Sequence, residues 1–478
     1  MNDNMMSLRQ AADFLQSRQI ACELVGDEGV MISRVHTDTR TVTTGDLFVA
    51  LRGERFDAHD FLPQAFSAGA VASLAERGLK ENGLSGLIVQ DAKRALGELA
   101  AAWRAQFDLP VIAVTGSNGK TTVTQMIASI LKALSPDHSL ATQGNLNNDI
   151  GVPLTLLRLR AHHTIAVIEL GMNHPGEIAY LSGLTQPTVA VVNNAQREHQ
   201  EFMHTVEAVA KENGSVISAL PADGVAVFPS DDAYCALWRA LANAREQICF
   251  SNGAIPADVT GQAEWLEASW RVRLATPLGA ANCQLKIAGR HNVKNALAAS
   301  AAALGAGVPL ATIIEGLEAF EAVKGRSRAL RITLERKTYN VIDDTYNANP
   351  DSVRAAIDIL AELPGPHMLV LGDMGEVGDQ GPEFHAEIGE YAAECGIEAL
   401  LCMGELMRYG AAVFPGARHF GGIESLAKAV LADLPQYRSV LVKGSRFMKM
   451  ERVVQAIEAS ASHPQDKVHN NKETAHAA

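Results

Sequence analysis

Residues 111–122 read VIAVTGSNGKTT, and this stretch decides the fold of the segment around it. Apolar and β-branched residues lead into two glycines, a lysine and two threonines, after which apolar side chains recur at helical spacing. This order predicts a strand, a phosphate-binding loop and a helix. The glycines let backbone N–H groups close around a phosphate, and the helix N-terminus adds partial positive charge. The commonest loop of this kind has a glycine at the position of Val114, so the loop is a variant.

The polar residues of this loop predict binding of a nucleotide triphosphate. We expect the Lys120 ammonium to reach the β- and γ-phosphates and the Thr121 hydroxyl to bind Mg²⁺. A glycine-rich turn with a purely structural role is the alternative, and the preceding strand and the attached Lys-Thr-Thr argue against it. The nucleotide-binding residues expected here are Gly116, Ser117, Asn118, Gly119, Lys120, Thr121 and Thr122.

The composition predicts a soluble globular protein of several domains. The chain has 478 residues, of which 47% are hydrophobic and 20% are charged. A formal net charge of −13 disfavours nucleic acid and membrane surfaces as partners, because both attract basic patches. Six scattered cysteines without a CxxC pair are typical of a reducing compartment, and the N-terminus has no apolar segment of a signal peptide. We therefore expect a cytoplasmic protein.

Residues 295–314 carry no charge and nominally reach membrane-spanning length. Two glycines and a proline interrupt this mostly alanine-rich segment. A buried helix followed by a turn is therefore expected, and no membrane insertion.

Apolar runs divide the chain into three α/β domains and a tail. Residues 1–108 form the first domain, with short strands and helices expected at 45–51, 61–68, 70–75, 86–90 and 92–106. Residues 109–326 form the central domain, where the unbroken apolar runs 164–170 and 188–192 are typical of buried parallel strands. Residues 327–462 form a smaller α/β domain with strands at 341–343, 368–371, 399–402 and 440–443. The polar residues 463–478 are expected to be disordered.

Two polar side chains follow strands of the central domain. Glu169 ends the first apolar run, and His199 comes after the second. Parallel α/β sheets bind ligands at the carboxyl ends of their strands, so Glu169 is a candidate ligand of a metal that bridges nucleotide phosphates. His199 is either a second metal ligand or an ordinary polar surface residue, and its position leaves both open.

Three further segments carry polar groups at the ends of elements. The segment GRHNVKN (289–295) opens the alanine-rich helix, where the asparagines cap the helix or bind an adenine edge, and capping is favoured. The segment DDTYNANP (343–350) follows a strand and holds more acidic and amide groups than a turn needs. The segment KGSR (443–446) follows the last strand, and plain surface charge is the safer interpretation.

Together these motifs resemble the Mur ligase family over nearly the whole chain. The family's TGxNGKT loop stands at 115–121, and its GxHNxxN motif stands at 289–295. Within the family, four segments resemble the enzymes that add D-alanyl-D-alanine: 37–40 with 45–53, 144–153, 169–173 and 344–350. The DNPR signature of the diaminopimelate-adding relatives is absent from the sequence.

The resemblance implies a small N-terminal α/β substrate domain, a central P-loop ATPase domain with a parallel sheet and a C-terminal Rossmann-like α/β domain. It implies an ATP-dependent ligase that joins D-alanyl-D-alanine to UDP-N-acetylmuramoyl-tripeptide through an acyl phosphate, in peptidoglycan synthesis. ATP and Mg²⁺ are the cofactors expected, and we expect a monomer. Two alternatives are a folylpolyglutamate synthase-like amide ligase, which shares the loop but lacks the first domain, and a nucleotide-binding regulatory protein with an inactive site.

The resemblance also assigns roles to residues. It makes Lys120, Glu169, His199 and Arg326 catalytic, with Arg326 acting in domain closure. Thr121 and Glu169 would hold one Mg²⁺ and His199 the other, while Asn295 would contact adenine and Asp344 ribose. The substrate-binding residues expected are Thr39, Arg40, Asn145, Asn147, Asn148, Asn347, Asn349 and Lys443.

One position departs from the family pattern. Many members carry a carbamylated lysine fourteen residues after the histidine that corresponds to His199, and here that residue is Asn213. Lys211 lies two residues earlier, which turns its side chain by roughly 200° around a helix. We expect no lysine carbamate, and Glu212 or a water is the candidate to complete the second metal site.

Overall fold

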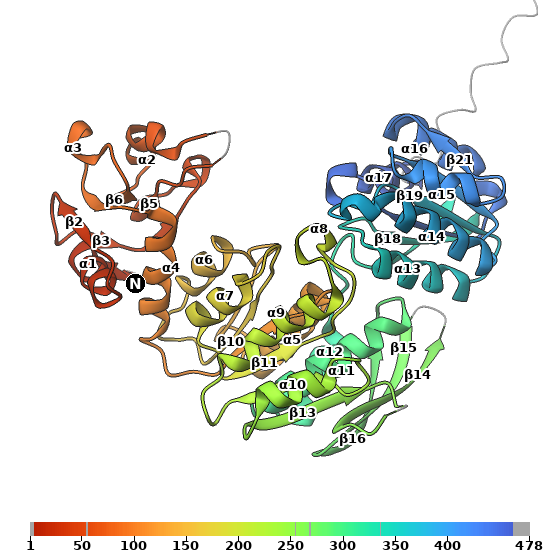
Figure 1. Cartoon of the computed structure of the whole chain (residues 1–478), viewed down its shortest axis with the longest axis horizontal. Coiled ribbons are helices and arrows are strands. Elements are labelled where there is room, and N and C mark those ends of the chain that lie inside the picture. The colour runs from red at the N-terminus through yellow and green to blue at the C-terminus, as the bar shows by residue number, and fades with distance from the viewer. Residues whose placement is uncertain (1–3, 54–55, 254, 267–268, 335, 462–478) are drawn as a thin grey trace, which may run out of the picture.

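The computed structural model describes residues 4–53, 56–253, 255–266, 269–334 and 336–461. Three lobes follow one another along the chain (Figure 1). Residues 1–108, 109–326 and 327–462 are called the first, central and third parts below, after the predicted domains. The tail predicted to be disordered, 463–478, lies outside the described residues.

The first part is a small sheet with helices around it. Its strand order is β2-β7-β6-β5-β4, parallel except that β2 runs antiparallel to β7. The predicted strands at 45–51, 70–75 and 86–90 and both predicted helices are confirmed within a few residues. The elements are β1 (Met6–Ser7), α1 (Leu8–Ser17), β2 (Cys22–Val25), β3 (Met31–Ile32), β4 (Arg34–His36), β5 (Asp46–Val49), α2 (Leu62–Ser67), β6 (Ala72–Ala75), α3 (Leu79–Asn82), β7 (Gly86–Val89) and α4 (Ala92–Arg104).

The central part is built on a long sheet with the order β16-β15-β14-β13-β12-β11-β8-β10-β9. Strands β8–β14 are parallel, which confirms the predicted parallel sheet, and β15 and β16 extend the sheet beyond β14 as an antiparallel meander. The strands are β8 (Val111–Thr115), β9 (Ser139–Ala141), β10 (Ile165–Glu169), β11 (Val189–Val192), β12 (Val225–Pro229), β13 (Glu246–Ser251), β14 (Val259–Leu266), β15 (Ser269–Thr276) and β16 (Gly279–Leu285).

Helices cover both faces of this sheet. Alternate residues of β8 enter two separate hydrophobic cores: Ile112 packs in the core that holds α5, α11 and α12, and Val111 packs in the core that holds α7 and α9. Because both faces are buried, the parallel strands read as continuous apolar runs. The helices are α5 (Lys120–Leu134), α6 (Gly151–Leu156), α7 (Glu177–Thr185), α8 (Gln200–Met203), α9 (Val206–Ser218), α10 (Cys235–Ala242), α11 (Arg290–Gly305) and α12 (Leu310–Ala319).

The uncharged segment 295–314 is divided between α11 and α12, with a turn between them. This confirms the predicted buried helix and turn. Among the described residues, no helix combines the length and apolarity needed to span a bilayer.

The third part holds a sheet with the order β17-β18-β22-β19-β20-β21, parallel except for the β17–β18 hairpin. The predicted strands at 341–343, 368–371, 399–402 and 440–443 are confirmed. The elements are β17 (Arg328–Leu334), β18 (Lys337–Asp344), α13 (Pro350–Glu362), β19 (His367–Leu371), α14 (Gly381–Glu394), β20 (Ala399–Met403), α15 (Met407–Val413), β21 (Arg418–Phe420), α16 (Ile423–Asp433), β22 (Ser439–Lys443) and α17 (Glu451–Ala461).

Candidate functional site

A cavity of about 960 Å³ lies between the central and third parts. The carboxyl ends of β8, β10 and β11 open into it from one side, and those of β18 and β22 from the other. Most of the predicted site residues line it: Ser117, Asn118, Gly119, Lys120, Thr121, Thr122, Asn145, Asn147, Asn148, Glu169, His199, Asn295, Arg326, Asp344, Asn347, Asn349 and Lys443. The structure therefore brings together side chains from two α/β sheets, as the placement of the motifs at strand ends predicts.

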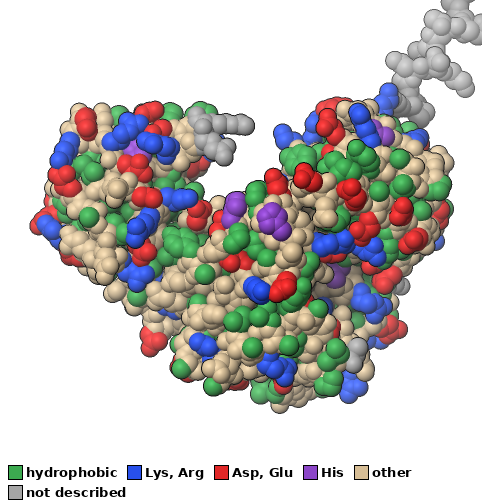
Figure 2. Space-filling view, in the orientation of Figure 1, with side chains coloured by type: hydrophobic (Ala, Val, Ile, Leu, Met, Phe, Trp, Pro, Cys, Tyr) green, Lys and Arg blue, Asp and Glu red, His purple; other side chains and the backbone are tan. Residues whose placement is uncertain are grey.

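Two predicted residues lie elsewhere. Thr39 and Arg40 line a smaller cavity of about 350 Å³ in the first part, together with the aromatic residues Phe48, Phe56 and Phe61. The Arg40 guanidinium is paired with Asp38 at 2.6 Å. Figure 2 shows a broad hollow between the lobe of the first part and the lobe of the third part.

The phosphate loop runs from β8 to α5 and needs glycine at two positions. Gly116 and Gly119 have φ angles of 129° and 82°, in the region that side chains disfavour. A Cβ on Gly119 would also lie 2.5 Å from the Asn295 side-chain oxygen, so this glycine allows α11 to approach the loop. Gly116 is not among the residues that line the cavity, and it contributes backbone shape to the loop.

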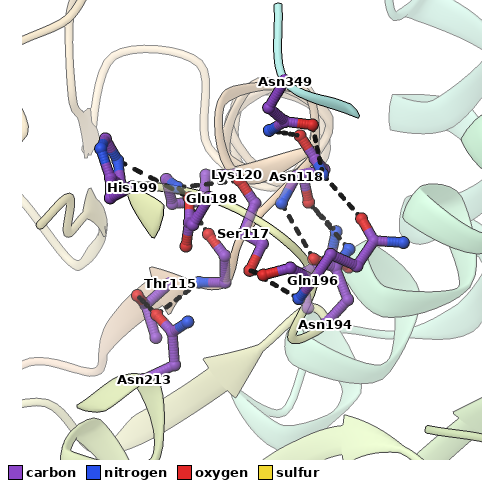
Figure 3. Close-up of polar contacts among 12 residues, drawn as sticks. Thr115, Ser117, Asn118, Lys120, Asn194, Gln196, Glu198, His199, Asn213 and Asn349 are labelled. Carbon is purple, nitrogen blue, oxygen red and sulfur yellow. Dashed lines mark hydrogen bonds and ion pairs between the residues drawn. The ribbon is translucent and has the colours of Figure 1, made fainter. Parts of the chain in front are cut away.

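Amide side chains after β11 hold the loop in place (Figure 3). The Asn118 N–H donates to Asn194 Oδ1 at 2.9 Å, and the Asn118 carbonyl accepts from the side chains of Asn193 and Asn194. The Gln196 N–H donates to the Ser117 hydroxyl at 2.8 Å. The segment 193–196 is thus the second wall of the phosphate loop.

Lys120 begins α5 and its ammonium is turned toward the loop. It donates to the Gly116 and Ser117 carbonyls and lies 3.1 Å from Glu198 Oε2. A cation at the first turn of a helix lies against the positive end of the dipole, and the carbonyls and the carboxylate offset that repulsion. The Lys120 ammonium is thus held at the loop where a nucleotide phosphate is expected.

Thr121 and Glu169 form a pair of hard oxygen donors. The Thr121 hydroxyl lies 3.0 Å from Glu169 Oε1, which also accepts from Asn147 Nδ2 at 2.7 Å. Glu169 is 1% exposed, and its Oε2 has no hydrogen-bond partner among the described residues. A buried carboxylate oxygen without a donor is costly, and Mg²⁺ prefers such oxygens together with phosphates and water. These residues therefore fit the predicted Mg²⁺ site.

His199 does not join this pair but lies on another wall of the cavity. Its Nδ1 lies 2.6 Å from Glu376 Oε2 of the third part, and its Nε2 lies 3.8 Å from Glu198 Oε2. Among the described residues, no three His, Cys, Asp or Glu side chains converge as a ready metal cage. Its predicted metal role stays a prediction.

Asn213 of α9 lies directly beneath the phosphate loop and is fully buried. Its Oδ1 accepts from the Thr115 hydroxyl at 2.6 Å and from the Gly116 N–H at 3.1 Å. Lys211 points away and pairs with Glu207 on the exposed side of the same helix, as predicted. Glu212 accepts from the Ile178 N–H at the start of α7, so its suggested role in completing the second metal site is not supported.

The asparagines of segment 289–295 do not cap α11, so the favoured capping prediction is wrong. Gly289 occupies the cap position and no side chain accepts from the first turn. Asn295 instead accepts from Asn193 at 2.9 Å and donates to Asn292 at 2.8 Å. Gly289 has no side chain that could accept from the first turn, and the amides of Asn292 and Asn295 line the cavity beside the phosphate loop instead.

Asp344 and Lys443 form a buried pair at the strand ends of the third part. The Lys443 ammonium donates to Asp344 Oδ2 at 2.5 Å and to the Asn347 carbonyl at 2.8 Å. Burial alone raises the pKa of the Asp344 carboxyl, but the Lys443 charge and the Ser327 N–H outweigh it and hold the pKa below its ordinary value. Lys443 is therefore a buried partner of Asp344 and not the plain surface charge that its motif favoured.

Other predicted residues connect or support the parts. Asn349 caps α13 by accepting from Ser352, and its Nδ2 donates to Asn118 Oδ1 at 2.9 Å across the cavity. Arg326 lies over the Tyr346 ring at 4.1 Å, and its buried Nε has no hydrogen-bond partner within the described part of the chain. Asn148 accepts from Gly151 at the start of α6, which is a structural contact.

Several residues that build this site are not among those predicted from the sequence. They are Asn193, Asn194, Gln196, Glu198 and Glu376. The three amides stand in the stretch NNAQREH (193–199), where amides at a strand end beside a phosphate loop are the signal that could have found them. Glu198 stands in the same stretch without such a signal. Glu376 has no pattern around it and is found only through its contact with His199.

Models of three family domains match the chain. They are described as "Mur ligase family, catalytic domain" at residues 31–104, "Mur ligase middle domain" at 114–303 and "Mur ligase, glutamate ligase domain" at 328–446.

Named relatives match over nearly the full length. The chain is 41% identical over 461 residues to the UDP-N-acetylmuramoyl-tripeptide–D-alanyl-D-alanine ligase of Escherichia coli, covering 96% of this chain and 99% of that protein. A crystal structure of MurF from Acinetobacter baumannii superposes with a TM-score of 0.86 at 36% identity, covering 94% and 98% of the two chains. MurF ligase from Thermotoga maritima in complex with ADP gives 0.78 at 27% identity, covering 90% and 98%. The chain therefore belongs to the Mur ligase family.

Proposed function

We propose that the chain is an ATP-dependent ligase that joins D-alanyl-D-alanine to UDP-N-acetylmuramoyl-tripeptide in peptidoglycan synthesis. The observation that carries the proposal is the 41% identity, over 96% of the chain, to a ligase with this activity. The cavity supports it, because the phosphate loop, the Thr121–Glu169 pair and the strand ends of the third part all line the same space.

The chemistry requires two anions to meet. The terminal carboxylate of the tripeptide attacks the γ-phosphorus of ATP, the bond to the leaving ADP breaks, and an acyl phosphate forms. The amine of the dipeptide then attacks the acyl carbon, loses a proton, and phosphate leaves. Mg²⁺, held by Thr121 and Glu169, would neutralise phosphate oxygens, and the Lys120 ammonium would stabilise the charge that develops on the γ-phosphate.

Water must be kept from the acyl phosphate, because hydrolysis would waste it. Contacts between the central and third parts close the cavity wall, among them Asn118 with Asn349 and His199 with Glu376. We propose that Arg326, at the junction of these parts, acts in this closure.

The remaining roles follow the family resemblance and the walls on which the residues lie. Asn295 lies beside Gly119, in keeping with a contact to adenine, and Asp344 is proposed to contact ribose. Thr39 and Arg40 would bind the UDP-sugar in the first part, beside the exposed rings of Phe56 and Phe61. The tripeptide, the dipeptide and the phosphates would bind to six further residues that line the cavity: Asn145, Asn147, Asn148, Asn347, Asn349 and Lys443.

The test is ADP release with ATP, Mg²⁺, tripeptide substrate and D-alanyl-D-alanine, with the product identified by mass spectrometry. We expect ADP only when both substrates are present, with tripeptides carrying diaminopimelate or lysine tried in parallel. ADP release with a folate and glutamate instead would favour the folylpolyglutamate synthase-like alternative. ATP binding without turnover under any condition would favour the regulatory protein.

We also propose that the enzyme works as a cytoplasmic monomer, because the phosphate loop, the Thr121–Glu169 pair and the strand ends of the third part all belong to one chain. Light scattering during gel filtration at working concentration measures the mass, for which 51.0 kDa is expected. Cell fractionation tests the location.

A further inference from the structure

The peptide stem of the proposed substrate must run between two fixed places. The UDP-sugar would lie beside Thr39 and Arg40 in the first part, and the terminal carboxylate of the tripeptide must reach the Lys120 ammonium in the large cavity. Asp149 and Tyr180 line the same cavity as Lys120, and both also touch α4, the last helix of the first part (Figure 1). The third residue of the stem, which carries the reacting carboxylate, therefore passes this wall.

An ion pair joins the first part to this wall. The Lys93 ammonium of α4 lies 2.7 Å from Asp149 Oδ2, and the two side chains are 57% and 37% exposed. The contact with Asp149 and the charges of Asp91 and Glu177 raise the pKa of Lys93, so its ammonium stays charged close to two carboxylates of the cavity. The pair thus presents one positive and one negative charge side by side at the rim of the cavity.

This pair contributes little to holding the two parts together. Helix α4 packs on α6 and α7 through apolar side chains, among them Leu96, Leu99, Val152 and Leu181, which are buried in one hydrophobic core. Exposed ion pairs add little to stability, because water solvates both charges when they are apart. The junction is therefore stabilised by apolar burial, and the two charges are available to a ligand.

The neighbouring carboxylate of the wall is already bound within the protein. Glu177 Oε2 accepts from the N–H groups of Asn173 and His174 at 2.7 and 3.2 Å. Asp149 differs, because its charge is met by a lysine that is more than half exposed. It can therefore take up a second cation without the loss of a buried contact.

The third residue of the stem brings its own charges within reach of the pair. Its carboxylate would react near Glu169, which accepts from Asn147, and Asp149 follows Asn147 by two residues, at most about 7 Å of chain. A side chain of four C–C bonds extends about 5 Å from the backbone. Diaminopimelate ends in an ammonium and a carboxylate on one carbon, whereas lysine ends in an ammonium alone. Beside an ion pair, both charges of such a zwitterion meet an opposite charge.

We infer that Asp149 and Lys93 bind the side chain of the third residue of the tripeptide and select diaminopimelate over lysine. The inference rests on the proposed function, since it names residues that recognise the substrate of that ligase. Asp149 accepts from the ammonium of the side chain, and Lys93 donates to its carboxylate. A lysine tripeptide satisfies Asp149 and offers nothing to Lys93.

The test compares two UDP-N-acetylmuramoyl-tripeptides, ending in meso-diaminopimelate or in L-lysine, by kcat/KM for ADP release at saturating ATP and D-alanyl-D-alanine. The unmodified enzyme should prefer the diaminopimelate tripeptide about tenfold or more, since a hydrogen bond between charged groups is worth roughly that factor. Lys93→Met should remove most of this preference and leave the lysine tripeptide unchanged, and Lys93→Glu should reverse the preference. Asp149→Asn should lower kcat/KM for both tripeptides about tenfold. Calorimetric binding of each tripeptide with a non-hydrolysable ATP analogue should give the same ratios without turnover.

The matched control is Lys80→Met, which removes another 57% exposed lysine of the first part, paired there with Glu23, and should keep the native preference. Equal losses for both tripeptides in Lys93→Met would show that the pair only docks the first part, and would overturn the inference. Equal or better use of the lysine tripeptide by the unmodified enzyme would overturn it as well, while leaving the ligase activity in place. Turnover of neither tripeptide would contradict the proposed function and the inference with it.

Discussion

At the scale of single residues, the Lys120 ammonium is the group whose loss should be most costly. Loop carbonyls and Glu198 surround it inside the phosphate loop. Lys120→Ala is expected to lower kcat by about a hundredfold or more, roughly 3 kcal/mol, because a charge aimed at the transferring phosphate is lost. Steady-state ADP release at saturating ATP measures the effect, and circular dichroism checks the fold.

The matched control for this change is Lys132→Ala, at an exposed position near the end of the same helix. It should keep native turnover. Near-native turnover in a folded Lys120→Ala variant would contradict the assignment of the phosphate loop.

Glu169 and His199 should differ in how their loss affects the Mg²⁺ requirement. Glu169→Ala removes a buried carboxylate beside the Thr121 hydroxyl, so the Mg²⁺ concentration for half-maximal ADP formation should rise about tenfold or more. Added Mg²⁺ should partly restore the rate. His199→Ala should behave in the same direction and more mildly. Unchanged Mg²⁺ dependence in both variants would show that neither residue is a metal ligand.

At the scale of elements, α9 supports the phosphate loop from below through Asn213, where relatives with a carbamylated lysine carry an ionised group. An amide cannot form a carbamate, so we predict that activity is indifferent to added bicarbonate. Lys211→Ala should keep most of the activity, because Lys211 is 62% exposed and pairs with Glu207 on the outer face of α9. A strong loss in Lys211→Ala that bicarbonate or short carboxylic acids restore would show that Lys211 carries the carbamate.

Strands with unbroken apolar runs were predicted, and strands with alternating burial were not. The parallel strands β8, β10 and β11 are buried on both faces, so their apolar runs alone reveal them. The meander β14–β16 was missed although β15 alternates between buried Trp270, Val272 and Leu274 and the exposed residues between them, because the strands of the central part were predicted from unbroken apolar runs.

Residues of the candidate site were also predicted only where the sequence carries a recognisable pattern. The residues at the carboxyl ends of β8, β10 and β18 were predicted, because parallel sheets bind ligands at these ends. Glu198 and Glu376 could not be singled out, since an isolated glutamate has no periodicity and its meaning depends on a partner from another part of the chain. The capping prediction for segment 289–295 is wrong because Asn295 bonds to Asn193, a residue far away in the sequence that α11 meets where it approaches the phosphate loop.

At the scale of the whole molecule, Arg197 joins the central part to the third part. Its guanidinium lies 2.6 Å from Asp351 Oδ1 and 2.8 Å from Glu387 Oε2, and the Arg197 backbone N–H donates to Asp351 Oδ2 at 2.8 Å. These partners stand on α13 and α14 of the third part (Figure 1). Glu198 and His199 follow Arg197 directly in the chain and line the cavity, so this network also holds their part of the cavity wall in place.

Arg197→Ala should therefore loosen the docking of the third part while leaving each part folded. The ion pairs of a quarter-exposed arginine with two carboxylates are worth about 1 kcal/mol, so the KM for ATP should rise roughly fivefold. The difference between the variant and the unmodified protein should shrink at higher salt concentration, because salt screens these ion pairs in the unmodified protein. Small-angle scattering should give a larger radius of gyration. The control is Arg354→Ala, which also removes a partner of Glu387 but within the third part, and should change neither quantity. Because Arg354 and Arg197 share that carboxylate, equal effects of the two variants would mean that the network stabilises the third part alone and does not hold the two parts together.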